Sequence, residues 1–165
     1  MSFIEDIKKK AKEQIKTIVL PEGEDIRTIQ AAEMVLKEQY ANLIILGNEE
    51  QILVTANKEK IDISKATIIE PEKSEKYNEY VQKFYELRKE KGMTIEKATE
   101  LMKDETHFGM MMVKQGDADG LVSGACHSTA DTLRPALQIL KTKPGTKLVS
   151  AFFVMVVPDC EYGSN

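Results

Sequence analysis

The segment from Val122 to Ala136, VSGACHSTADTLRPA, holds the residue types that could bind an anion. Pro135 has no backbone N–H and fits the first turn of a helix, which predicts a helix that starts near Thr132. The small and hydroxylated residues 124–131 then form a loop between a strand and this helix. Free N–H groups and hydroxyls at the positive end of a helix suit phosphate or carboxylate. This loop is therefore a candidate anion site.

Arg134 would lie in the first turn of that helix. Its charge would face the positive end of the helix dipole, at a cost of about 0.3–1 kcal/mol. A bound anion would turn this cost into attraction, because a guanidinium group can grip two oxygens. A pair with Asp131, three residues earlier, is the alternative, and the residues alone leave both interpretations open.

Cys126 and His127 could indicate a metal site or a nucleophile. They are adjacent in a loop, and the remaining cysteine and histidine of the chain are Cys160 and His107. These four residues make a poor ligand set, so we expect no metal site. A nucleophilic pair would need a spatial proximity that a sequence does not show.

Two further segments could border a site. Arg88 follows Phe84 by four residues at the edge of an apolar helical stripe, a position typical of a surface arginine. The segment 21–28, PEGEDIRT, follows a strand and opens a helix, and Glu24 and Asp25 could simply cap that helix. The sequence contains neither G-x-G-x-x-G nor a P-loop lysine pattern, which leaves dinucleotide and Walker-type nucleotide binding without support.

Helical and strand patterns alternate along the chain. Apolar spacing predicts helices at 2–15, 25–40, 49–57, 73–91, after Thr94, at 104–115 and at 132–142, and strands at 17–20, 43–46, 67–69, 119–123 and 148–157. Ser2 and Glu5 have the spacing of a capping box. The last strand contains AFFVMVV, which is apolar on both faces and typical of the middle of a parallel sheet. The pattern predicts an α/β fold with a mostly parallel sheet and helices on both faces.

Composition narrows the class of protein. The 165 residues carry a net charge of −4, and 40 of the first 105 residues are charged against 10 of the last 60. The mild acidity argues against nucleic acid as a partner, and no apolar run approaches the roughly 20 residues of a membrane helix. Two cysteines and an N-terminus without an apolar signal region favour a reducing cytoplasm.

Several segments resemble the phosphate acetyltransferase (phosphotransacetylase) family. The matching stretches are LPEGEDIRT at 20–28, FYELRK at 84–89, DGLVSGACHSTADTLRPA at 119–136, SAFF at 150–153 and VPDCEYG at 157–163. The resemblance covers essentially the whole chain, and the block at 119–136 is highly specific.

The resemblance implies two α/β domains of isocitrate-dehydrogenase-like architecture with an active site in the cleft between them. It implies acetyl transfer between acetyl phosphate and coenzyme A, by direct thiolate attack in a ternary complex, in a cytoplasmic homodimer with coenzyme A as a substrate and no bound cofactor or metal. Residues 1–150 would form the N-terminal domain and residues 151–165 the start of the second. The residues assigned to binding coenzyme A or phosphate are Arg88, Arg134, Ser128, Thr129 and Asp131, with His127 and Cys160 near the cleft.

The departure from the family is length. Family members run about twice as far, and their Ser-Arg pair and the Asp that assists thiol deprotonation have no match in this chain. The catalytic residues are therefore unknown, and the activity of these 165 residues on their own is doubtful. Two alternatives remain: the related butyryl-transferring enzyme, and a non-catalytic module that binds anions or coenzyme A.

Overall fold

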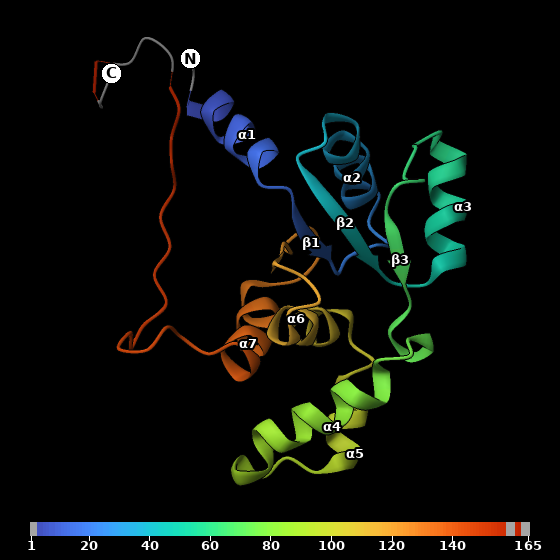
Figure 1. Ribbon diagram of the computed structural model, residues 1–165, viewed down its shortest axis with the longest axis vertical. Coiled ribbons are helices and arrows are strands. Elements are labelled where there is room, and N and C mark those ends of the chain that lie inside the picture. Colours follow the sequence, from blue (N-terminus) through green and yellow to red (C-terminus); the bar gives the residue numbers. More distant parts are fainter. Residues whose placement is uncertain (1–2, 158–160, 163–165) are drawn as a thin grey trace.

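The computed structural model describes residues 3–157 and 161–162. Its centre is a parallel sheet of four strands, β1 (Lys16–Leu20), β2 (Ala41–Leu46), β3 (Thr67–Ile69) and β4 (Gly120–Leu121). The strands lie in the order β3-β2-β1-β4, so β1 has β2 on one side and β4 on the other (Figure 1). This confirms the predicted α/β class and the parallel sheet.

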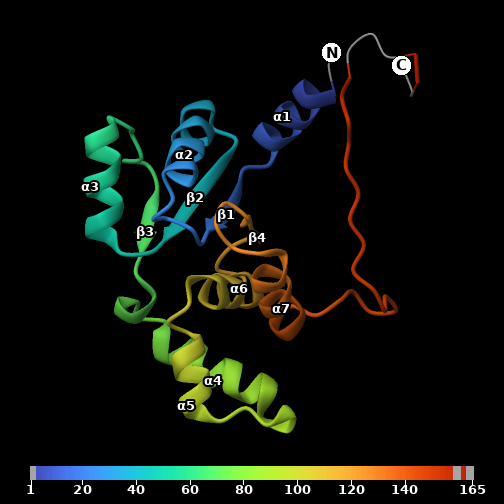
Figure 2. The same cartoon turned by 180° about the vertical axis from the view of Figure 1, so that it is seen from behind.

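Helices cover both faces of the sheet (Figure 2). Helices α2 (Ile26–Glu38) and α3 (Glu49–Glu59) pack on one face. The other face carries α4 (Tyr77–Arg88), α5 (Ile95–Leu101), α6 (Glu105–Gln115) and α7 (Thr129–Ile139). Helix α1 (Phe3–Glu13) has no buried residue among those described, and two short 3-10 turns, η1 (Pro71–Lys73) and η2 (Lys89–Lys91), flank α4.

Strand β2 shows why the central strands are apolar without alternation. Leu43 and Ile45 are buried against α2 and α3, whereas Ile44 and Leu46 are buried in the core on the opposite face. A strand covered on both faces needs apolar side chains at every position. The same burial on two sides holds β1 and β2 rigidly, and these strands position the loops that follow them.

Most predicted elements are present, with shifted ends. Asp25 caps α2 and Thr94 caps α5 through their side chains, as expected for both. The helix predicted at 73–91 is shorter, since α4 ends at Arg88 and Gly92 caps the 3-10 turn that follows. The capping box predicted at Ser2 lies outside the described residues.

The strand predicted at 148–157 is wrong. None of these residues belongs to a strand, and the segment runs apart from the sheet (Figure 1). The side chains of Phe152 and Phe153 are 87% and 93% exposed. An apolar run has the composition of a buried strand, but it becomes one only where a neighbouring strand offers hydrogen-bond partners.

No helix in the described part of the chain has the length and apolar character that a bilayer crossing requires.

Candidate functional site

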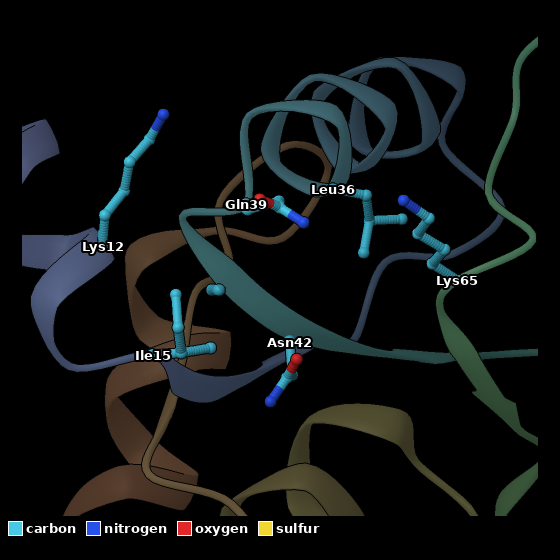
Figure 3. A pocket seen from close by; sticks show the side chains of 7 residues that line it. Lys12, Ile15, Leu36, Gln39, Asn42 and Lys65 are labelled. Atoms are coloured by element: carbon cyan, nitrogen blue, oxygen red, sulfur yellow. The ribbon is translucent and has the colours of Figure 1, made fainter.

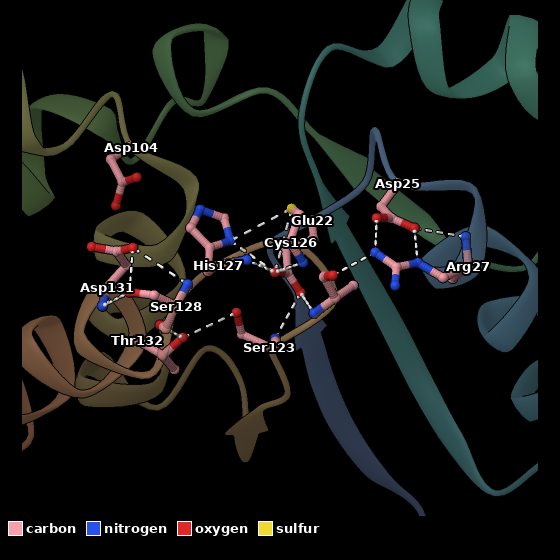
Figure 4. A network of polar contacts seen from close by, with 12 residues as sticks. Glu22, Asp25, Arg27, Asp104, Ser123, Cys126, His127, Ser128, Asp131 and Thr132 are labelled. Atoms are coloured by element: carbon pink, nitrogen blue, oxygen red, sulfur yellow. Dashed lines mark hydrogen bonds and ion pairs between the residues drawn. The ribbon is translucent and has the colours of Figure 1, made fainter.

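Two loops that are distant in the sequence meet at one edge of the sheet. The first follows β1 and the second follows β4, and these two strands are parallel neighbours, with Val19 opposite Leu121. Their carboxyl ends therefore lie together, which is where open α/β sheets bind ligands. Figure 4 shows the polar contacts between the two loops.

Glu22 is the centre of this contact. Its side chain is 3% exposed, and both carboxylate oxygens accept backbone N–H groups of the second loop. Oε2 accepts from Gly124 and Ala125, and Oε1 accepts from Cys126 and His127, each at 2.9 Å. Four consecutive amides thus converge on one carboxylate.

The charge of Glu22 is stabilised where it lies. Burial by itself raises the pKa of the carboxyl, but the backbone N–H groups of Ala125, Cys126 and His127 outweigh burial. Together with the His127 ring, whose Nδ1 lies 2.8 Å from Oε1, they hold the pKa of Glu22 well below its ordinary range. The residue is therefore ionised across the physiological pH range.

This contact overturns one expectation. The amides of residues 124–127 were expected to be free for an external anion, but they are bonded to Glu22. A concave group of successive N–H donors binds whichever anion is nearest, and here the chain supplies it. Gly124 permits the loop geometry, because its φ of +130° is rarely adopted by residues with a side chain.

Helix α7 begins at the end of this loop, three residues earlier than predicted. Ser128 is the N-cap, and it forms a capping box with Asp131: Ser128 Oγ accepts from the Asp131 amide and Asp131 Oδ2 accepts from the Ser128 amide, both at 3.3 Å. Pro135 consequently lies inside the helix and is buried, not in the first turn. The capping box satisfies two orphan amides and sets the helix start, which a proline alone does not.

The earlier start also moves Arg134. It is exposed in the second turn of α7, so its charge does not carry the dipole cost expected for the first turn. Hydrogen bonds from Ser128 are the main cause that lowers the pKa of Asp131, and the charge of Arg134 contributes less. Among the described residues, the salt bridges within 4 Å do not include Arg134.

Sequence reasoning missed Arg27 as well as Glu22. The Arg27 guanidinium donates to both oxygens of Asp25, at 3.0 Å from Nε and 2.6 Å from Nη2, and also to the Ala125 carbonyl. A pocket of about 290 Å³ lies beside it, lined by Glu22, Arg27, Ser123 and neighbours from both loops. The segment 21–28 was recognised as a possible site border, but neither residue carries a local signal for its long-range contact.

The Cys126 thiol is exposed, 3.5 Å from Glu22 Oε1 and 3.9 Å from His127 Nδ1. Desolvation and the Glu22 carboxylate raise its pKa, so the sulfur stays a protonated thiol and is a poor nucleophile. Ligand-type atoms of Glu22, Cys126 and His127 lie within 4.8 Å of one another. Since both Glu22 oxygens already accept N–H groups, we assign this cluster to fixing the loop.

A second pocket, of about 380 Å³, lies at the opposite end of the sheet (Figure 3). It is lined by Lys12, Ile15, Leu36, Gln39, Ala41, Asn42 and Lys65. Ala41 and Asn42 open β2, so this pocket is at the amino ends of the strands. Of the candidate site residues that the structure describes, none lines this pocket.

Comparison with known proteins shows the family of this chain. The family model for phosphate acetyl/butaryl transferase matches residues 2–163. The chain belongs to this family. A phosphate acetyltransferase of Thermoanaerobacterium thermosaccharolyticum is 60% identical over 165 residues, and one of Acetivibrio thermocellus is 57% identical over the same length. In both comparisons all of this chain is aligned, to 50% and 49% of the relative.

Solved structures of the phosphate acetyl/butaryl transferase family share the fold. The EutD phosphotransacetylase from Staphylococcus aureus matches with a TM-score of 0.81 and 48% identity over 88% of this chain and 44% of its own. A phosphotransacetylase from Streptococcus pyogenes matches with a TM-score of 0.84 and 41% identity. This match covers 90% of this chain and 46% of the solved one. The chain thus spans about half the length of the relatives it matches.

The residues expected to serve this transferase family lie in three places. Ser128, Thr129, Asp131 and His127 are together at the start of α7. Arg88 ends α4, which contacts α7, and its Nε is buried without a hydrogen-bond partner among the described residues. Cys160 lies outside the described residues.

Proposed function

We propose that this chain forms the substrate-binding part of a phosphate acetyltransferase, which transfers an acetyl group reversibly between acetyl phosphate and coenzyme A. The observation that carries the proposal is identity of 57–60% with curated phosphate acetyltransferases over every residue of the chain. The site geometry supports it, because the most specific matching block is the one that forms the loop and helix start beside β4.

In this proposal the start of α7 receives the phosphate group. The hydroxyl groups of Ser128 and Thr129 lie at the positive end of the helix, and Arg134 stands one turn further along. Arg88 is half-buried at the end of α4, and its buried Nε has no hydrogen-bond partner in the described part of the chain, which suits an anionic group of coenzyme A. Asp131 supports these groups from the capping box.

The reaction would proceed by direct attack in a ternary complex. The coenzyme A thiolate attacks the carbonyl carbon of acetyl phosphate, a C–S bond forms, the C–O bond to phosphate breaks, and inorganic phosphate leaves with the electron pair. Positive groups stabilise the oxyanion and the departing phosphate. We place the group that deprotonates the thiol outside these 165 residues, because the relatives are about twice as long. A cytoplasmic homodimer, and a division into residues 1–150 and a second domain from 151, belong to the same proposal.

The test uses the full-length protein that carries this chain. Wild type should form acetyl-CoA from acetyl phosphate and coenzyme A, with a higher kcat/KM for acetyl than for butyryl phosphate. Arg134→Ala should raise a substrate KM at least about tenfold, since a hydrogen bond to a charged group is worth about 1.5–3 kcal/mol. Lys37→Ala, an exposed cation on α2, is the matched control and should stay within about twofold of wild type.

Two results would contradict the proposal. A wild-type protein without acetyl transfer would remove the activity itself. Unchanged KM and kcat/KM in Arg134→Ala would remove the start of α7 from the substrate site while leaving the activity in place.

A further inference from the structure

We infer that Glu22 is the positioning residue of the substrate site, and that its carboxylate sets where the start of α7 presents itself to the phosphate group. This inference rests on the proposed function. It adds a residue that touches no substrate and acts through the loop at 124–127.

The turn after β1 leaves Glu22 little freedom. The amide of Gly23 donates to the Leu46 carbonyl at 3.1 Å, which ties the turn to the end of β2. A Cβ at Gly23 would lie 2.5 Å from that carbonyl oxygen and 2.7 Å from side-chain atoms of Ile45 and Ile52. The backbone next to Glu22 is therefore packed directly against the core.

The carboxylate transfers this rigidity to the second loop. Each of its two oxygens accepts two of the four consecutive amides, all at 2.9 Å. His127, the last of the four, is followed directly by Ser128, the N-cap of α7. Because no residue separates the clamped loop from the helix, a shift of the loop is a shift of the helix start.

The clamp also decides which donors remain for a ligand. With the amides of residues 124–127 neutralised by Glu22, the loop does not compete for phosphate. The Ser128 hydroxyl donates to Asp131 Oδ2 at 2.6 Å, so the positive end of α7 and the Thr129 hydroxyl are donors that remain here among the described residues. Glu22 thus concentrates anion binding at one place although it is itself an anion.

The experiment compares variants in the full-length protein. Glu22→Gln keeps the shape but replaces one acceptor oxygen with an NH₂ group that faces two N–H donors. Glu22→Asp keeps the charge and withdraws it by about 1.5 Å, one C–C bond. Glu24→Gln is the matched control, because Glu24 is exposed two residues away. Circular dichroism identifies the conditions under which each variant is folded.

The decisive readout is the split between KM and kcat. Glu22→Gln should raise the KM for acetyl phosphate at least about tenfold, because a misplaced helix start loses aligned hydrogen bonds to a charged group, each worth about tenfold or more in affinity. Glu22→Asp should recover part of the affinity, and Glu24→Gln should match wild type. A residue that serves only stability would lower the active fraction, and so the apparent kcat, at constant KM.

Hydrogen exchange gives a readout that does not depend on turnover. In Glu22→Gln the amides of residues 124–127 should exchange at least about tenfold faster, because their acceptor is lost. The inference is overturned if folded Glu22→Gln, or folded Glu22→Asp where the first variant does not fold, keeps both the wild-type KM and slow exchange at these amides. An inactive wild type would instead overturn the proposed function, so the two failures are distinguishable.

Discussion

At the scale of single residues, the titration of Glu22 links the site to stability. Its pKa is lower in the folded protein than its ordinary value of 4.5, so the ionised form is stabilised by folding. For a carboxyl with a depressed pKa, this contribution is fully present above the ordinary value. It is lost as the pH falls below 4.5 and through the folded pKa.

Wild type and Glu22→Gln should therefore differ in stability by an amount that depends on pH. Glu22→Gln should lower the free energy of unfolding by about 2–4 kcal/mol at neutral pH, because four partly buried N–H groups lose a charged acceptor. The gap to wild type should narrow on acidification below 4.5, because the Glu22 carboxyl takes up a proton in the unfolded state while it stays ionised in the folded state. Urea denaturation of both proteins at about pH 7 and about pH 3.5 measures this difference in the free energy of unfolding. A gap of constant size, or an equal narrowing in Glu24→Gln, would contradict the assignment.

A second buried residue with a polar group, Tyr80, lies in the core that α4 and α6 form on one face of the sheet. Its side chain is fully buried, its ring packs against Phe108 with centroids 5.0 Å apart, and its hydroxyl donates to Asp117 Oδ2. Burial is the largest cause that raises the pKa of the Tyr80 hydroxyl far above its ordinary value, and the hydrogen bond to Asp117 is the next. The hydroxyl therefore stays protonated and remains a donor.

Removal of that hydroxyl should cost stability without disturbing the packing. Tyr80→Phe is expected to lower the free energy of unfolding by about 1–2 kcal/mol, the usual value of a hydrogen bond to a group that keeps another partner. Asp117 does keep one, since Lys76 Nζ donates to its other oxygen. Tyr85→Phe on the same helix is the control and should change stability by less than about 0.5 kcal/mol. Equal effects of the two substitutions would show that the Asp117 contact contributes nothing.

At the scale of secondary-structure elements, local patterns predicted what local interactions determine. Apolar runs located β1, β2 and β3, and the side chains of Asp25 and Thr94 marked the starts of α2 and α5. The start of α7 was misplaced because Pro135 is compatible with a helix start without requiring one. The capping box of Ser128 and Asp131 was the decisive local signal.

The Glu22 clamp could not be predicted in the same way. It joins residues 102 to 105 positions apart, and the sequence shows only a carboxylate after one strand and a small-residue loop after another. The strand order places β1 beside β4, and that order is a property of the whole sheet. The general location of the site follows from the rule for parallel sheets, but the partner of the loop amides does not.

The turn between β1 and α2 carries a prediction at this scale. Gly23→Ala places a methyl group 2.5 Å from the Leu46 carbonyl oxygen, a backbone atom held inside the sheet. Relief requires the turn to move, at a cost of about 1–3 kcal/mol in thermal or urea unfolding. Gly120→Ala in β4 is the control, since its Cβ would meet only Ile18 at an ordinary 3.4 Å. A Gly23→Ala protein as stable as Gly120→Ala would show that the turn adjusts freely.

At the scale of the whole molecule, two exposed regions differ in character. One edge of the sheet carries the polar loops of the candidate site, whereas residues 148–157 extend away from the folded body as an apolar strip (Figure 2). Apart from Ser150 and Ala151, every side chain in the strip is a large apolar one that is more than half exposed. An extended, uncharged segment rich in valine and phenylalanine is a template for pairing with another strand.

We therefore expect the 165-residue chain, produced on its own, to self-associate through this strip. Burial of each phenylalanine stabilises the contact by about 1.5–3 kcal/mol, so a Phe152→Ser, Phe153→Ser double variant should weaken association at least about 100-fold. Sedimentation velocity over a range of concentrations measures this. Met34→Ser, which removes a single exposed apolar side chain from α2, is the control and should associate as wild type does. A wild-type chain that stays monomeric at every concentration, or a double variant that associates as strongly, would mean that the strip makes no contact between copies, since its apolar area is the driving force for the contact.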